Sequence, residues 1–140
     1  MRLKSNGFGD GALIPGEFAF AVIDPLSHVA LGNNRNPHLA WDDVPARTQS
    51  FVLMCHDPDA PSRGDDVNKV GCEVPKSLPH HYIFTLYALD VPRLEAYGGL
   101  IGTGIRVALA GHMLAETRLT GLYMLNPRLM QQQRSRCSVT

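Results

Sequence analysis

Glycine and proline recur along the whole chain and limit the length of any regular segment. The 140 residues include 13 glycines and 10 prolines. Such punctuation is typical of short strands joined by turns and not of long helices. The predicted fold class is therefore mainly β.

Three segments have strand patterns. Residues 17–22 alternate in a way that predicts a half-buried strand. Ser50–His56 carries a continuous apolar run, which favours a strand covered on both faces, as in the centre of a sandwich. Residues 81–89 are rich in aromatic and β-branched side chains and give the clearest strand. By contrast, residues 58–79 show no period, and a loop of about 20 residues in a compact domain is either functional or a sign of something lost.

One late helix is predicted. Ile105, Leu109 and Met113 recur at a spacing of four, and Thr103 precedes them as an N-cap. We expect this helix to end within residues 117–121 and a short last strand to follow. Strands with a single late helix predict a β-sandwich with helical decoration.

The bulk composition is that of one globular domain, with 44% apolar and 19% charged residues. Thirteen basic residues balance thirteen acidic ones, so no global field favours nucleic acid or an anionic membrane. The apolar runs are too short for a membrane span, and no signal peptide is expected. Three cysteines without a C-x-x-C pair fit a reducing, cytoplasmic location. Residues 130–140, which include Cys137, are expected to be a disordered polar tail and not a prenylation signal.

Two short motifs could carry chemistry. Asp57 and Asp59 follow the apolar run and are stiffened by prolines, which lowers the entropy cost of holding a ligand. From the residues alone, Asx-turn bonds to the backbone are the favoured alternative. His80 and Tyr82 should share one face of the next strand and offer donors to a phosphate or carboxylate, while His81 faces the other way. The alternative is a pair of solvent-facing histidines.

Several site classes lack their sequence patterns. The six histidines and three cysteines show no metal-ligand spacing, the Gly102–Gly104 segment lacks the dinucleotide fingerprint, and no G-x-S-x-G elbow exists. We therefore predict no metal, no cofactor and no enzymatic activity. A phosphate-ester hydrolase using Asp57 and His80 as an acid–base pair is a weaker hypothesis, because no nucleophile stands out.

Three ordered blocks resemble the phosphatidylethanolamine-binding protein family, and most closely its bacterial Raf-kinase-inhibitor-like branch. They cover most of residues 37–127. The first block is PHLAWDDVP at 37–45, which continues into DPDAPS at 57–62. The second is HHYIFTLYALD at 80–90. The third is AGHMLAE at 110–116 with LTG at 119–121, and it resembles the family's C-terminal helix and last strand.

The resemblance implies a Greek-key antiparallel β-sandwich with one C-terminal helix and a small anion pocket. Family members bind phosphate-like groups, and various members act as phospholipid-headgroup binders or as inhibitors of kinases or proteases. The residues that match the family's pocket motifs are Asp57, Asp59, Pro61, His80 and Tyr82.

The chain also departs from the family pattern. The family's H-W strand and G-P-x-P-P wall are missing, as though an internal segment between about residues 64 and 80 had been deleted from a single domain spanning 1–129. A sandwich without an interior strand exposes an edge, so we expect a marginal monomer, a homodimer or a smaller repaired sheet. The leading hypothesis is binding of a small anionic or phosphorylated ligand, with a role toward a protein partner. A degenerate scaffold with a non-functional pocket is the alternative.

Overall fold

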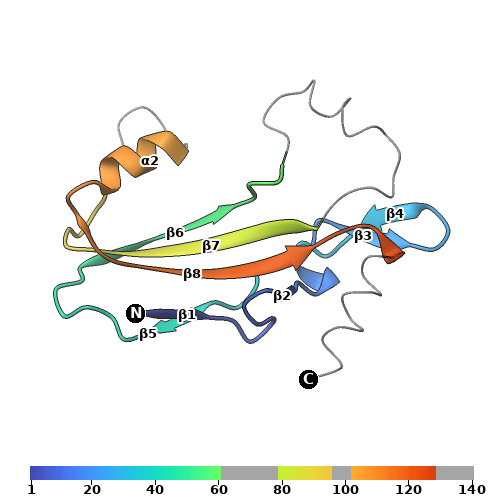
Figure 1. The fold of residues 1–140 in the computed structure, drawn as a ribbon, viewed down its shortest axis with the longest axis horizontal. Helices are drawn as coiled ribbons and strands as arrows, with labels where there is room; N and C mark the ends of the chain where they lie inside the picture. Colours follow the sequence, from blue (N-terminus) through green and yellow to red (C-terminus); the bar gives the residue numbers. More distant parts are fainter. Residues whose placement is uncertain (61–78, 96–101, 129–140) are drawn as a thin grey trace. The chain divides into compact units, whose positions relative to one another are not determined.

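The computed structural model describes residues 1–60, 79–95 and 102–128 (Figure 1). Within these residues the chain is mainly β, as predicted, with one α-helix and one 3-10 turn. The strands are β1 (Arg2–Lys4), β2 (Ala12–Leu13), β3 (Ala21–Asp24), β4 (His28–Leu31), β5 (Ala40–Asp42), β6 (Ser50–His56), β7 (His80–Leu89) and β8 (Met113–Tyr123). The 3-10 turn is η1 (Gly16–Phe18) and the helix is α2 (Gly102–Leu109).

The largest sheet has four strands in the order β2-β8-β7-β6. β6 and β7 pair antiparallel, from Ser50 opposite Leu89 to His56 opposite Ile83. β2 pairs parallel with β8. β1 with β5, and β3 with β4, form two antiparallel two-stranded sheets. These sheets agree with the predicted β class, while their closure into a sandwich stays a prediction.

Contacts divide the chain into two compact units. The first comprises Met1–Lys4, Leu39–His56 and Ile83–Leu119, and the second Ser5–His38, Asp57–Tyr82 and Thr120–Thr140. The buried side chains of the first unit include those of Leu3, Leu86, Ala88, Leu89, Leu109 and Leu119, and those of the second Phe8, Ile14, Leu122, Tyr123 and Met124. The candidate site lies within the second unit.

β6 has the predicted bounds but not the predicted burial. It stands at the end of the four-stranded order, and Phe51 and Leu53 are exposed. Cys55, in the same apolar run, is exposed as well. The expectation of a strand covered on both faces is therefore wrong, because an apolar run does not specify what packs over each face of the strand. Trp41 of β5 covers part of β6, with its ring centroid 5.3 Å from that of Phe51.

The predicted helix exists but ends earlier than expected. α2 stops at Leu109, Gly111 adopts φ +85°, and β8 begins at Met113. Glycine takes this left-handed conformation without a Cβ penalty and is the usual residue just past a helix end. The expectation of helix to residues 117–121, and of the family's C-terminal helix over 110–116, is wrong. From residue 116 to 119 exposure alternates as in a strand.

The segment predicted as a strand over residues 17–22 is divided in two. η1 ends at Phe18, and β3 begins only at Ala21. Pro15 precedes η1, and its carbonyl accepts a hydrogen bond from the Phe18 N–H at 3.1 Å. The proline-led turn therefore takes the first half of the alternating pattern. The eight-residue α2 is too short to cross a membrane, and no other helix in the described part of the chain could do so.

Candidate functional site

The loop after β6 is shaped by a bond within itself. The backbone N–H of Asp59 donates to Oδ1 of Asp57 at 2.9 Å. This is an Asx turn, in which a carboxylate stands in for a backbone carbonyl. The structural alternative weighed for Asp57 is therefore present, and it uses one of the two carboxylate oxygens.

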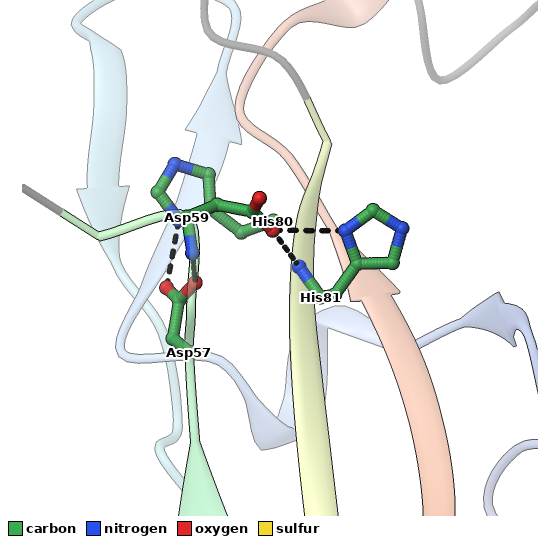
Figure 2. A network of polar contacts seen from close by, with 4 residues as sticks. All are labelled: Asp57, Asp59, His80 and His81. Carbon is green, nitrogen blue, oxygen red and sulfur yellow. Dashed lines mark hydrogen bonds and ion pairs between the residues drawn. The ribbon is translucent and has the colours of Figure 1, made fainter.

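The other oxygen of Asp57 contacts a histidine 23 residues away. Oδ2 lies 2.7 Å from Nδ1 of His80, the first residue of β7 (Figure 2). The Asp57 side chain is 17% exposed and that of His80 32%. The contact is short for a hydrogen bond between a carboxylate and an imidazole, and both side chains are partly shielded from water. Two residues from separate sequence blocks are thus held together.

Asp59 makes an equivalent contact with the next histidine. Its Oδ2 accepts a hydrogen bond from the backbone N–H of His81 at 2.8 Å and lies 2.8 Å from Nδ1 of the same residue. The His81 side chain is half exposed. Hydrogen bonds from the His81 side chain and backbone, with smaller contributions from the charges of His81 and His80, hold the pKa of Asp59 below its usual value against a small effect of burial.

The two pairs lie on different sides of one strand. Figure 2 shows the imidazoles of His80 and His81 on opposite sides of the β7 ribbon. Successive strand residues point to opposite faces, so this alternation confirms the sequence prediction. Asp57 thus contacts the histidine on one face of β7, and Asp59 contacts the histidine on the other.

Tyr82 and Pro61 complete the set that the sequence singled out. Tyr82 is half-buried and follows His80 by two residues on β7. The nearby Tyr123 is buried, and its hydroxyl donates to the Ala21 carbonyl at 2.7 Å. Burial, and to a smaller extent the charge of Tyr82, raises the pKa of Tyr123. Pro61 lies outside the described residues.

The arrangement can donate hydrogen bonds and hold a proton. Two carboxylates face two imidazoles, and each imidazole keeps its Nε2 on the side away from its carboxylate. Within the described ranges, no three His, Cys, Asp or Glu side chains come together in a way that could hold a metal ion. The site is therefore suited to acid–base exchange and to hydrogen bonding with a polar ligand.

Sequence reasoning missed the role of His81. It was assigned only to the face opposite His80, although its pairing with Asp59 fixes the loop against β7. A third pair was also missed: Nδ1 of His112 lies 3.1 Å from Oδ1 of Asp90, within the first unit. No sequence spacing signals these contacts, because each pair is more than twenty residues apart.

The comparisons with known proteins agree with one another. A model of the family described as phosphatidylethanolamine-binding protein matches residues 4–75 and 67–124. The chain is 31% identical over 162 aligned positions to the UPF0098 protein YbhB of Escherichia coli, covering 88% of this chain and 99% of the relative. A UPF0098 protein of Methanothermobacter thermautotrophicus is 30% identical over 159 positions, covering 88% and 98%.

Solved structures show the same fold. The crystal structure of a putative phosphatidylethanolamine-binding protein homolog from Chlamydia trachomatis superposes with a TM-score of 0.66 at 24% identity, covering 88% of this chain and 96% of that one. Escherichia coli YbcL, described as a member of the mammalian family, gives a TM-score of 0.63 at 21% identity, covering 87% and 96%.

Proposed function

This chain belongs to the phosphatidylethanolamine-binding protein family, and we propose that it is a non-enzymatic binding protein for a small anionic or phosphorylated ligand. The observation that carries the proposal is the 2.7 Å contact between Asp57 and His80. It joins the two sequence blocks in which the candidate ligand-binding residues lie.

The proposed roles follow from the geometry of the pairs. Asp57 orients His80, whose Nε2 is directed away from the carboxylate and can meet a ligand oxygen. The Tyr82 hydroxyl is a second donor on the same face of β7. Asp59 holds the loop against β7 through its contact with His81. A proline at position 61 limits the backbone conformations open to this loop. In this proposal Asp59 and Pro61 shape the site more than they contact the ligand.

A reduced domain is part of the proposal. The alignment to the Escherichia coli relative spans 162 positions although this chain has 140 residues, so it opens gaps in the chain. The two matched stretches of the family model also overlap, at residues 67–75. Both facts support loss of an internal segment between about residues 64 and 80 from one domain over 1–129. The wall normally supplied by that segment would be absent, which makes a degenerate scaffold the competing reading.

Titration with O-phosphorylethanolamine, followed by the histidine imidazole NMR signals, tests the function. We expect the His80 signal to move at millimolar ligand. His80→Gln should weaken binding by about tenfold or more, the usual cost of losing a hydrogen bond to a charged group. His112→Gln, which removes a histidine from a similar aspartate pair, is the matched control and should bind normally. If no signal moves at millimolar ligand, the scaffold reading holds.

The same preparation tests the proposed absence of catalysis. A panel of phosphate esters incubated with the protein should show no turnover. Turnover that disappears in His80→Ala would instead support the hydrolase hypothesis, with Asp57 and His80 as the acid–base pair.

We extend the proposal to a homodimer, a protein partner and a cytoplasmic location. The dimer is supported by β6, which ends the four-stranded order and exposes Phe51 and Leu53. A further protein partner follows only from the resemblance to kinase- and protease-inhibiting relatives. The exposed thiol of Cys55 fits a reducing compartment.

A further inference from the structure

The hydrogen bonding of His80 fixes which of its nitrogens carries a proton. A carboxylate only accepts hydrogen bonds, so the 2.7 Å contact with Asp57 requires the proton on Nδ1 of His80. A neutral imidazole has one N–H, and its other nitrogen is then a bare lone pair. In the neutral pair, Nε2 of His80 is therefore an acceptor. Among the described residues, none makes a hydrogen bond to this nitrogen.

A fully ionised anion cannot bind to such a nitrogen, because both partners would be acceptors. From this we infer that the Asp57–His80 pair takes up one proton from solvent for each fully ionised anion that binds. The inference rests on the proposed function and concerns how the same site is regulated. The proton adds to the lone pair of His80 Nε2 and gives an N–H that donates to the anion, and no bond of the anion breaks.

The charges around the pair favour the same step. With both imidazoles neutral, the carboxylates of Asp57 and Asp59 leave the site with two negative charges, which repel an anion. Hydrogen bonds from His81, aided by the charges of His81 and His80, keep the pKa of Asp59 low, so its carboxylate stays ionised. Burial and the charge of Tyr82 raise the pKa of Tyr123, so that phenol stays neutral. His81 is paired on the other side of β7, as Figure 2 shows.

Moving the proton of neutral His80 from Nδ1 to Nε2 would also give a donor for the anion, but at a higher cost. A neutral imidazole with its proton on Nε2 would turn a bare Nδ1 toward the Asp57 carboxylate at 2.7 Å, with no hydrogen between them. Two acceptors at that distance repel, and each loses its hydrogen bond. Adding a proton to Nε2 avoids this cost, because Nδ1 keeps its proton and its hydrogen bond to Asp57.

The proton between His80 Nε2 and the bound anion can come from solvent or from the anion itself. Comparing sulfate with inorganic phosphate distinguishes these two sources. Sulfate has no proton to give near neutral pH, so its binding requires the pair to be protonated. Hydrogen phosphate could instead donate its own P–OH to a bare Nε2. The measurement is calorimetric titration of the whole chain with each anion, from about pH 6 to about pH 8.5, in buffers of different ionisation enthalpy. The buffer dependence gives the number of protons taken up.

We expect sulfate to bind with uptake of about one proton at the alkaline end, where its Kd should rise about tenfold per pH unit. His80→Gln should abolish both effects. Asp57→Asn should keep the Asx turn through Oδ1 and present an amide N–H to Nδ1, which places the histidine proton on Nε2. Sulfate affinity in this variant should lose its pH dependence. His112→Gln is the matched control and should behave like the wild type.

The outcomes separate the inference from the function it rests on. If neither anion binds at any pH, the proposed function fails. If both bind with pH-independent sulfate affinity and no proton uptake, the function stands and the inference is overturned. Binding of phosphate without sulfate also overturns it, since the imidazole would then be the acceptor.

Discussion

β6 and β7 are neighbours in one sheet, and both are strongly apolar, yet their burial is opposite. Leu53 of β6 pairs with Leu86 of β7 in the antiparallel register. Leu53 is 47% exposed, whereas Leu86 is fully buried. β7 has a strand on each side, while β6 ends the order. The difference shows that an apolar sequence does not by itself determine whether a strand is buried, because burial depends on what packs beside the strand and over its faces.

Truncating each leucine of this pair should give the largest difference. Leu86→Ala should lower the free energy of unfolding by about 2–5 kcal/mol, because it leaves a cavity in a packed core. Leu53→Ala should lower it by less than about 1 kcal/mol, as expected of a half-exposed side chain. Urea unfolding followed by circular dichroism measures both. Equal losses would mean that β6 is covered in solution.

The proposed homodimer is the next way to test the comparison, because a second copy could supply the neighbour that β6 lacks among the described strands. Light scattering after size exclusion should then give twice the chain mass of 15.3 kDa. Leu53→Lys should raise the dimer Kd by about tenfold or more, since a lysine charge is costly to bury. Leu26→Lys, at an exposed leucine between β3 and β4, is the control. A wild-type monomer at every concentration would rule out the dimer.

The smallest expected effect on stability is that of Asp59, which follows β6 and contacts His81 at the start of β7. The pKa of Asp59 is lowered in the folded chain by hydrogen bonds from His81. Its carboxylate therefore stabilises the fold above the unfolded-state pKa of about 3.9, and this is lost as the pH falls through the lower, folded value. Asp59→Asn should be less stable than the wild type at neutral pH, and the difference should vanish in acid. Urea midpoints at both pH values measure it. A difference that persists in acid would contradict the assignment.

The sequence predicted the strands best where pattern and context agree. β6 has the predicted bounds, and β7 begins one residue earlier than predicted. The prediction of the helix end was wrong, because one local residue outweighed a longer pattern. The spacing of Ile105, Leu109 and Met113 favours a helix, but Gly111 ends it and Met113 begins a strand. Burial of β6 could not be predicted, because it depends on the strand order.

The candidate site could be predicted in part. Strand alternation correctly separated His80 from His81, since the pleat fixes the face of each residue. The partner of each histidine could not be predicted, because the Asp57–His80 and Asp59–His81 contacts depend on how a distant loop returns to the strand.

The two oxygens of Asp57 have a consequence for which amino acids that position can tolerate. One oxygen closes the turn onto Asp59 and the other faces His80. Asparagine would retain the turn but reverse the polarity toward the imidazole. Glutamate would keep both acceptors, but its extra methylene lengthens the side chain and moves them out of the geometry of an Asx turn. Serine lacks the second oxygen. A saturation library at position 57, selected for sulfate binding above neutral pH, should therefore favour asparagine over aspartate, whereas selection for loop stability together with pH-dependent release should return aspartate alone.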